Sequence, residues 1–386
     1  MTQTGLDRLV ASGFDELKGR RVGIVCNQAS VARDFRHILD HAMDHVEVLA
    51  AFGPQHGIWG HTQDNMIEWE GYEDASTGLR FYSLYGEHRK PTPSMLDDID
   101  TLVFDLQDVG ARYYTFTWTL LLCMQACAEL GKEFWVLDRP NPISGMNPQG
   151  TVLEPAYASF VGLVPLPMRH GLTMGELAIH FKRETVQNID LHVHQMVNWH
   201  RRMAYEETSA SWVNPSPNMP DTETTWVYPG MCLLEGTSIS EARGTTRPFV
   251  QFGHPRFDSR HLCELLNQEA SLRGAVYRPI SYQPTFHKFV GEICQGAFIH
   301  VVNRLEFDAT LAAVAIMKHA WEIGACQWLD PPYEYEYIKL PIDILSGNAW
   351  LRGAIESGSE LRDIETRMKA ECEIFEPTRQ AAFLYN

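Results

Sequence analysis

The sequence predicts an α/β protein, with a Rossmann-like, doubly wound parallel sheet and a second, smaller α/β domain. The first observation is that nearly continuous apolar segments of strand length alternate with helical patterns up to about residue 140. Such strands are typical of a parallel sheet that helices cover on both faces. The second observation is the length of 386 residues, which exceeds what one small hydrophobic core organises. We therefore expect two domains.

The N-terminal elements follow from the spacing of the apolar residues. Segments such as RVGIVCN and TLVFDLQD predict buried strands, whereas TFTWTLLLCMQACAELG has the length of a helix. The glycine that ends this helical pattern, Gly131, is a typical helix stop. The expected strands are 21–27, 46–52, 79–86, 101–108 and 133–142, and the expected helices are 34–45 and 115–131.

The segment 147–249 is rich in proline, glycine and hydroxyl residues, so it predicts little regular structure. We interpret it as a long excursion that packs over the sheet, which makes 1–249 the N-terminal domain. The pattern changes near residue 250, and 250–386 is the predicted smaller α/β domain. Its expected elements are a strand at 297–303 and helices at 259–272, 307–324 and 360–375.

The charge and the apolar patterning exclude several classes of partner. A net charge of −17 argues against nucleic acid and anionic membrane surfaces, because both attract a basic face. An anionic small molecule stays possible, since an acidic protein can contain a local basic pocket. No apolar run reaches the roughly 18 residues that span a bilayer. The N-terminus lacks a signal-peptide pattern, so we expect a cytoplasmic location; the oligomeric state stays open.

Neither a metal nor a cofactor is expected. The eight cysteines include no CxxC pair, which is typical of reduced core thiols, and there is no HExxH motif or Cys/His cluster. After the first strand the chain has NQASVARD in place of the G-x-G-x-x-G that approaches a dinucleotide pyrophosphate. The P-loop and the G-x-S-x-G motif are also absent.

Polar side chains follow all five expected strands at the point where each strand ends. In open parallel sheets, ligands bind outside the carboxyl ends of the strands, so these clusters predict one shared crevice. For a single cluster, helix capping or turn formation is the favoured explanation; for five together, we favour the crevice. The clusters are Asn27 and Gln28; Gln55 and His56; Tyr85; Asp105, Gln107 and Asp108; and Asp138, Arg139 and Asn141.

The segment DLQDVGARYYTFTWT is the densest of these motifs. Arg112 has the geometry to clamp a carboxylate through two hydrogen bonds. Tyr113 and Tyr114 present flat apolar faces with a polar tip, which suits a sugar ring. An aspartate–arginine pair that only braces the loop is an equally good explanation.

Two further segments contain candidate residues. Thr173 and Glu176 form the pattern of a helix capping box, which we favour over a catalytic role for Glu176. His170, just before that helix, either faces the crevice or is structural. The segment 233–249 combines acidic and basic residues with hydroxyls, which favours a binding loop over a surface loop with internal salt bridges.

Several long motifs occur together and in a fixed order. The chain resembles the DUF1343, or YbbC-like, family of the exo-β-N-acetylmuramidase NamZ type. The resemblance extends from about residue 5 to the last residues and rests on GPQHGIWG, FYSLYG, DLQDVGARYYTF, VLDRPNPISG, SFVGLVPLPMRHGLTMGELA, PSPNMP and YPGMCLLEGTSISEARGTTRPF.

The resemblance implies a Rossmann-like domain, a smaller C-terminal domain and an active cleft between them. It also implies a cofactor-independent glycoside hydrolase that removes terminal N-acetylmuramic acid from peptidoglycan fragments. Members typically have PEHG where this chain has Gln55 in PQHG, and EGR where it has Ala242 in EAR. The glutamine cannot ionise or donate an acid proton, whereas glycoside hydrolysis generally needs a carboxylic acid. Many relatives are exported.

The leading hypothesis is therefore a muramidase-type glycosidase that acts on a small carbohydrate. We expect Asp108 and Glu241 to be the catalytic carboxylates, with Asp105 and Glu235 as second choices. A non-hydrolytic sugar-binding protein is the main rival, because of Gln55; a nucleotide-dependent enzyme is a weaker one, suggested only by the topology. The expected substrate-binding residues are Gln55, His56, Gln107, Arg112, Tyr113, Tyr114, Asp138, Arg139, Asn141, His170, Glu235 and Arg243.

Overall fold

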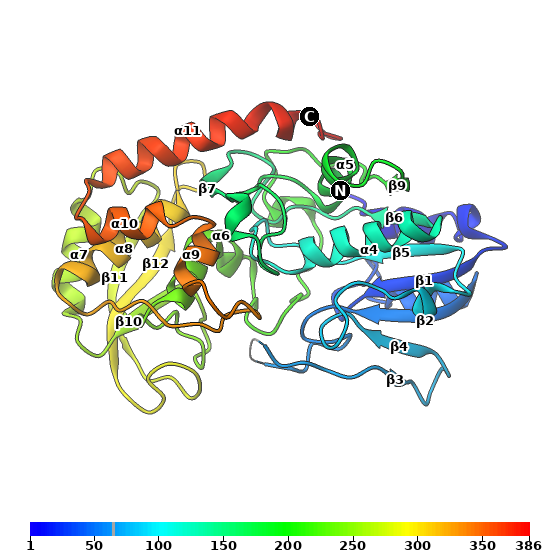
Figure 1. Ribbon diagram of the computed structural model, residues 1–386, viewed down its shortest axis with the longest axis horizontal. Coiled ribbons are helices and arrows are strands. Elements are labelled where there is room, and N and C mark those ends of the chain that lie inside the picture. The colour runs from blue at the N-terminus through cyan, green and yellow to red at the C-terminus, as the bar shows by residue number, and fades with distance from the viewer. Residues whose placement is uncertain (64–65) are drawn as a thin grey trace.

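The computed structural model describes residues 1–63 and 66–386, and these residues form two lobes. One lobe holds the large sheet and the other holds a small antiparallel sheet with its helices (Figure 1). Helix α11 (Leu361–Gln380) starts on the C-terminal lobe and runs along the top of the molecule toward the N-terminal lobe. The last helix therefore links the two lobes.

The large sheet confirms the predicted doubly wound fold. Its order is β3-β4-β2-β1-β5-β6-β9, and every neighbouring pair is parallel except β3 with β4. Without β3, the parallel strands have the order 3-2-1-4-5-6 of a dinucleotide-binding sheet, which reverses direction between β1 and β5. The strands are β1 (Arg21–Cys26), β2 (Glu47–Gly53), β3 (Tyr72–Glu73), β4 (Arg80–Ser83), β5 (Thr101–Asp105), β6 (Glu133–Leu137) and β9 (Asp190–His194).

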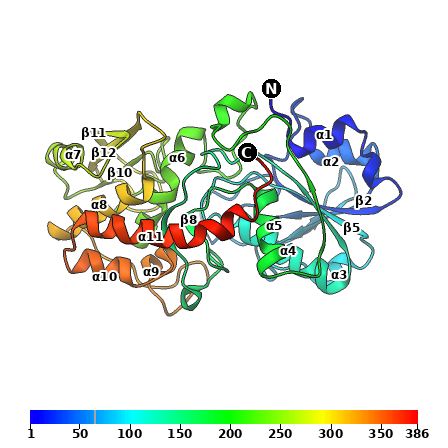
Figure 2. The same ribbon diagram turned by 90° about the horizontal axis from the view of Figure 1, so that it is seen from above.

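Helices cover both faces of this sheet, which explains why β5 is buried along its whole length. Figure 2 shows α1 and α2 on one face and α3, α4 and α5 on the other. These helices are α1 (Gly5–Ala11), α2 (Ile38–Met43), α3 (Pro93–Leu96), α4 (Phe116–Leu130) and α5 (Met174–Glu184). Gly131 follows α4 in the left-handed conformation, as expected for a helix stop.

The segment 147–249 is more regular than its composition predicts. Its strand β9 completes the parallel sheet, and α5 is the crossover helix that precedes it. The short β7 (Gln149–Val152) and β8 (Pro167–Arg169) form a separate two-stranded sheet, and α6 (Thr222–Met231) packs on α8. The strand β9, DLHVH, has too few apolar residues to be predicted from the sequence alone. It forms a strand because its neighbours supply the sheet context.

The C-terminal lobe contains an antiparallel sheet of order β10-β12-β11 and a set of helices, which confirms a smaller second α/β unit. The strands are β10 (Gln251–His254), β11 (Ala275–Tyr282) and β12 (Cys294–Val301). The helices besides α11 are α7 (Ser259–Gln268), α8 (Ala309–Glu322), α9 (Pro341–Ser346) and α10 (Trp350–Glu356).

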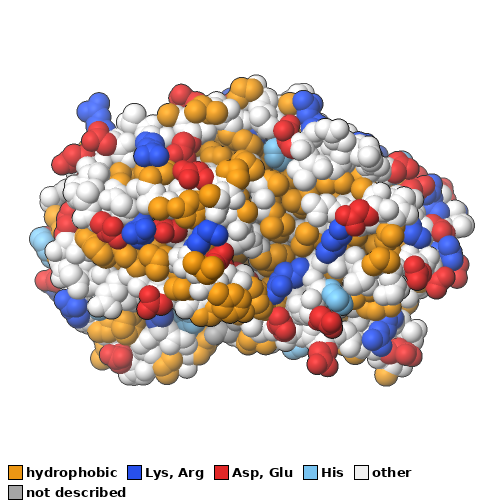
Figure 3. All heavy atoms as spheres, in the orientation of Figure 1, with side chains coloured by type: hydrophobic (Ala, Val, Ile, Leu, Met, Phe, Trp, Pro, Cys, Tyr) orange, Lys and Arg blue, Asp and Glu red, His pale blue; other side chains and the backbone are white. Residues whose placement is uncertain are grey.

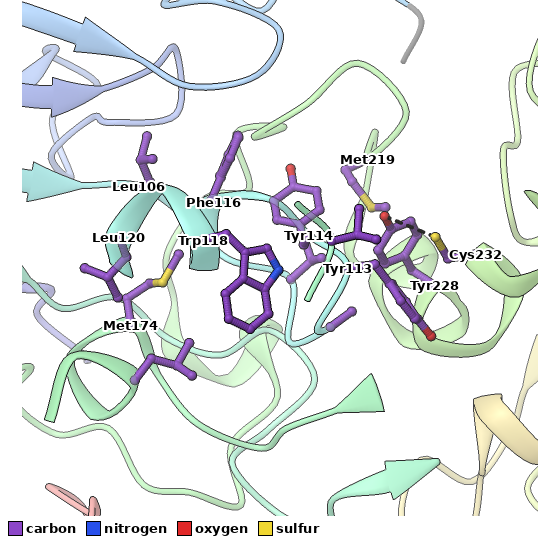
Figure 4. Close-up of a cluster of buried hydrophobic side chains, with 14 of the residues drawn as sticks. Leu106, Tyr113, Tyr114, Phe116, Trp118, Leu120, Met174, Met219, Tyr228 and Cys232 are labelled. Carbon is purple, nitrogen blue, oxygen red and sulfur yellow. Dashed lines mark hydrogen bonds between the residues drawn. The ribbon is translucent and has the colours of Figure 1, made fainter. Parts of the chain in front are cut away.

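A continuous hydrophobic core extends from the large sheet into the region between the lobes. Figure 4 shows Tyr113 and Tyr114 next to Tyr228 at one side of this core, with Phe116 and Trp118 further in. All eight cysteines are buried and free. In the part of the chain that the structure describes, no helix is both long enough and apolar enough to cross a membrane.

Candidate active site

A pocket of about 420 Å³, open mouth included, lies between the two lobes. On the face shown in Figure 3, hydrophobic side chains gather where the lobes meet. The N-terminal lobe provides the loop after β2 and the start of α4. The C-terminal part provides the 3-10 helix η4 (Cys232–Gly236) and a turn near residue 334. The pocket is lined by Gln55, His56, Tyr113, Tyr114, Thr115, Val161, Ser216, Asn218, Met219, Tyr228, Glu235, Arg243, Phe249, Tyr333 and Glu334.

Gln55 takes part in a buried hydrogen-bond network at this pocket. Its side-chain oxygen accepts a hydrogen bond from Thr115 Oγ1 at 2.7 Å. Its Nε2 donates to the Tyr85 hydroxyl at 3.1 Å and to Glu334 Oε1 at 3.3 Å. Tyr85 in turn donates to Glu334 Oε2 at 2.8 Å. Gln55 is therefore an amide that orients a buried carboxyl group from the other lobe.

Glu334 is a buried carboxyl group in the pocket that the sequence did not single out. Burial and, to a lesser extent, the charge of Glu235 raise the pKa of Glu334 to about 7, against the opposing effect of the hydrogen bonds from Tyr85 and Gln55. A carboxylic acid that holds its proton near neutral pH is suited to general acid catalysis. The segment PPYEYEYI offered no pattern for this role, because its glutamates are alike until the lobes pack together.

Arg89, which follows β4, braces the turn that carries Glu334. Its guanidinium stacks on the ring of Tyr335 at 3.7 Å from the ring centre and also lies over Phe160 at 5.1 Å. A cation held over an aromatic face gains electrostatic stabilisation. The stack therefore fixes the residue next to Glu334 against the N-terminal lobe.

The raised pKa of Glu334 makes stability depend on pH. The folded state binds the proton more tightly than the unfolded state, whose ordinary pKa is 4.5. The stabilisation that the protonated Glu334 contributes is therefore fully present below pH 4.5 and is lost as the pH rises through about 7. E334Q has no proton to lose at this position. The difference in free energy of unfolding between E334Q and the native chain should therefore shift in favour of E334Q by on the order of 2 kcal/mol from pH 5 to pH 8. Urea denaturation at both pH values measures this, and an unchanged difference would contradict the assigned burial.

Strained backbone surrounds the pocket. His56, Ala242, Phe249, Glu334 and Tyr335 all have positive φ angles, between 44° and 70°. Residues other than glycine rarely adopt this left-handed conformation, and it concentrates at functional sites. The backbone thus holds the side chains of this region in directions that an unstrained chain would not favour.

Ala242 is the position where the family resemblance implies glycine. It is fully buried, and its φ of 61° lies in the left-handed region. Glycine adopts that region without steric cost, so A242G should stabilise the fold by about 1 kcal/mol despite the loss of one methyl group. Thermal unfolding measures the gain. A lower melting temperature would mean that packing of the methyl group outweighs the backbone strain.

Glu235 and Arg243 form an ion pair in the pocket wall. Arg243 Nη2 contacts Glu235 Oε1 at 2.6 Å, and the Tyr333 hydroxyl donates to Glu235 Oε2 at 2.8 Å. The charges of Glu235 and the neighbouring Glu241 raise the pKa of Arg243 against the effect of burial, so the arginine stays charged. Glu235 is thus a second carboxylate at the pocket, held by a permanent cation.

Glu241 lies behind Arg243 and is fully buried. Lys288 Nζ contacts it at 2.9 Å and His287 Nδ1 at 3.0 Å, and Arg243 Nε lies at 3.5 Å. Although burial opposes ionisation, these cations hold the pKa of Glu241 well below its usual range. Lys288 also donates to the backbone oxygens of Leu234 and Ile239, so the group fixes the segment that carries Glu235.

Asp108 and His170 pair with each other rather than lining the pocket. His170 Nε2 lies 3.2 Å from Asp108 Oδ2, and the same oxygen accepts from the backbone N–H of Gly110 at 2.7 Å. The His170 ring also accepts from the backbone N–H of Leu172 at 3.2 Å. Tyr114, which does line the pocket, is close enough to Asp108 for that charge to raise its pKa, although burial is the larger cause.

Two other expected site residues have structural partners. Arg112 is buried and donates to the backbone oxygens of residues 151, 166 and 345, with burial lowering its pKa to about 10. Asn141 donates to Leu172 O at 2.9 Å and accepts from the N–H of Ile143. These contacts brace loops, and neither side chain lines the pocket between the lobes.

Asp138 holds the start of α5. Its carboxylate accepts from Thr173 Oγ1 and from the backbone N–H of Gly175, both at 2.8 Å, and from the hydroxyl of Tyr385 at 2.6 Å. Burial raises its pKa to about 6. The capping box of Thr173 and Glu176 is present, as expected.

The remaining residues lie at a second crevice. Arg139 pairs with Asp105 at 2.5 Å, and Gln107 donates to the backbone oxygens of Asp108 and Pro140. Arg139 and Gln107 line that crevice and not the pocket between the lobes. The expectation of one crevice shared by five strand ends is therefore wrong: the polar clusters divide between two pockets and several buried braces. Among the described residues, no group of three or more His, Cys, Asp or Glu side chains is arranged to hold a metal.

Two family models match the chain. Residues 22–223 match the N-terminal part of the exo-beta-N-acetylmuramidase NamZ, and residues 226–385 match its C-terminal part. The domain boundary after residue 249 stays a prediction. The peptidoglycan beta-N-acetylmuramidase NamZ of Bacillus subtilis (strain 168) is 41% identical over 386 residues, which cover 99% of this chain and 91% of that protein.

Two solved structures are similar along the whole chain. Both are DUF1343 family proteins from Bacteroides fragilis NCTC 9343, and each comparison covers 100% of this chain and 99% of the other. They are 32% and 27% identical, with TM-scores of 0.89 and 0.78. The chain therefore belongs to the NamZ family of exo-β-N-acetylmuramidases, also described as DUF1343.

Proposed function

We propose that the chain is a peptidoglycan exo-β-N-acetylmuramidase whose active site is the pocket between the lobes. Its substrate would be a peptidoglycan fragment that ends in N-acetylmuramic acid. The observation that supports this most is Glu334, a buried carboxyl group whose pKa of about 7 leaves about half of it protonated at neutral pH. It supplies the acid that Gln55 cannot provide.

In the proposed reaction, Glu334 donates its proton to the glycosidic oxygen as the bond from that oxygen to the anomeric carbon breaks. Glu235 is the second carboxylate, and its negative charge stabilises the positive charge that develops on the sugar ring. A water molecule then provides the hydroxyl group of the released sugar. Its remaining proton restores the carboxyl group of Glu334 by way of Glu235 or solvent, which completes the balance.

This assignment differs from the pair that the sequence favoured. Glu241 contacts Arg243, His287 and Lys288 and does not line the pocket; Asp108 is occupied by His170 and Gly110. A general acid must reach the leaving oxygen and carry a proton at the working pH. Glu334 lines the pocket and has a pKa raised to about 7, which supports Glu334 with Glu235 over Asp108 with Glu241.

The walls of the pocket suit an amino sugar with a carboxylate. Tyr113, Tyr114 and Tyr228 offer aromatic faces for the apolar side of a sugar ring. Among the expected substrate-binding arginines Arg112, Arg139 and Arg243, only Arg243 lines this pocket, because Arg112 and Arg139 are held elsewhere. Arg243 is therefore the preferred candidate for that contact.

The rival function is that of a sugar-binding protein that does not hydrolyse its ligand. It is supported by Gln55, which stands where the family usually has a glutamate. The two functions separate in one assay with a disaccharide in which N-acetylmuramic acid is the non-reducing sugar. We expect release of free N-acetylmuramic acid, detected by chromatography. A thermal shift with the disaccharide but no release over extended incubation would instead establish the binding protein.

A further inference from the structure

A second crevice lies at the place where the strand order of the large sheet reverses. The loops after β1, β5 and β6 all contribute to it, so it occupies the position where doubly wound sheets bind ligands. It encloses about 540 Å³, open mouth included. The proposed hydrolysis does not use this crevice, because the carboxyl groups assigned to it, Glu334 and Glu235, line the pocket between the lobes.

The floor of this crevice has unused hydrogen-bonding capacity. Gln107 is 2% exposed and lines the crevice, and its Oε1 atom has no hydrogen-bond partner among the described residues. Its Nε2 is already used, since it donates to two backbone oxygens. Leaving a buried acceptor unpaired costs free energy, so its presence on a cavity wall indicates a ligand that donates a hydrogen bond.

Arg139 adds a donor beside this acceptor. Its Nε and Nη2 atoms bond to Asp105 and to the backbone oxygen of Val31, whereas its Nη1 atom makes no hydrogen bond to a described residue. The charge of Arg139 is matched by Asp105 at 2.5 Å. The crevice therefore presents both a donor and an acceptor without a net charge from this pair.

The rim of the crevice has an aromatic ring in the position of a platform. Phe35 lines the crevice, is 62% exposed and has a φ of 63°. Exposing a large apolar side chain to water is unfavourable, and so is the left-handed backbone conformation of a residue other than glycine. An aromatic face beside paired donors and acceptors is the combination that binds the ring of a sugar.

The charges at the rim also balance. Arg33 and Asp7 both line the crevice, and Asp7 Oδ1 accepts from the backbone N–H of Arg33 at 2.9 Å. Together with Arg139 and Asp105 they contribute two positive and two negative charges. This balance favours a neutral, hydroxyl-rich ligand over an anion such as a nucleotide, in agreement with the absence of a glycine-rich phosphate loop.

We propose that this crevice is a second carbohydrate-binding site, which takes a neutral pyranose. One segment separates it from the active site: Val213 lines the crevice, while Ser216, Asn218 and Met219 line the pocket between the lobes. Asn27 and Gln28 from the loop after β1 hold this segment through the backbone oxygens of residues 215 and 214. The proposal does not require hydrolysis; only the choice of N-acetylglucosamine as one probe rests on the proposed function.

The test is saturation-transfer NMR titration of the full chain with N-acetylglucosamine and, separately, with glucose. F35G removes the ring while providing the residue that its backbone conformation favours, so the fold should be retained. We expect it to weaken binding of at least one of the two sugars about fivefold to tenfold. A210W fills the crevice and should abolish that binding, while I374S on the exposed face of α11 should leave it unchanged.

The outcomes separate this proposal from the proposed function. Loss of sugar binding in F35G and A210W, with release of N-acetylmuramic acid retained, supports a second site. Native-like binding of both sugars in both variants, with melting temperatures confirming that they fold, overturns it. In a third outcome, the native chain releases no N-acetylmuramic acid but binds sugar, and F35G and A210W do not bind it. The second site then stands and the muramidase assignment fails.

Discussion

E334Q should lower kcat/KM for a muramoside with a natural sugar leaving group by about 10² to 10⁴-fold. The amide has nearly the same shape as the protonated carboxyl group but has no acidic proton, so the leaving oxygen departs without protonation. Gln55 and Tyr85, which contact Glu334, remain in place to hold the new side chain. Steady-state kinetics on a disaccharide with terminal N-acetylmuramic acid measures the effect.

A leaving-group comparison shows whether the lost group is the acid. A 4-nitrophenyl muramoside needs little protonation, because nitrophenolate is a stable anion, so the variant should lose much less activity on it. E336Q is the matched control: Glu336 lies two residues further, does not line the pocket and pairs with Lys339 at 3.1 Å. Equal losses on both substrates would remove Glu334 from the acid role and assign it to binding or folding.

The pH profile gives an independent readout of the same group. Because the protonated form of Glu334 is the active one, kcat/KM on the disaccharide should fall as the pH rises through about 7. This alkaline limb should disappear in E334Q, whose residual rate no longer depends on that proton. A limb that persists unchanged in the variant would belong to another group.

In the large sheet, the sequence predicted those strands that are buried along most of their length. β5 is buried at every position and stands out from the sequence, whereas β9 pairs only with β6 at the sheet edge and is mostly half-buried. Edge strands need less apolar surface, so their sequences resemble loops. The same reasoning explains why the regular structure within 147–249 was underestimated.

The site was harder to predict, because it depends on which polar groups pair with each other. Asp105 and Arg139 end neighbouring strands and form an ion pair with each other, although both had been expected to face one ligand. Glu334 becomes a buried acid only because Tyr85 and Gln55, more than 240 residues earlier in the chain, pack against it. Contacts of such long sequence separation leave no local pattern. That Gln55 bears on catalysis stays a prediction.

Q55E should raise kcat/KM for a chromogenic muramoside at least tenfold, which is about 1.4 kcal/mol of transition-state stabilisation. The new carboxylate keeps the hydrogen bond from Thr115, since the oxygen that accepts it is retained. Its other oxygen takes the place of Nε2, 3.3 Å from Glu334 Oε1, where two carboxyl groups share one proton. One group then provides the acid while the other adds negative charge beside the developing cation.

The shared proton has a second measurable consequence. A neighbouring carboxylate raises the pKa of Glu334 above about 7, so the alkaline limb of the activity profile should move to higher pH in Q55E. Q195E adds the same charge at an exposed position outside the pocket and should change neither the rate nor the limb. If Q55E folds, as its melting curve would show, and turns over no faster than the native chain, then a carboxylate at position 55 adds nothing to catalysis in this pocket.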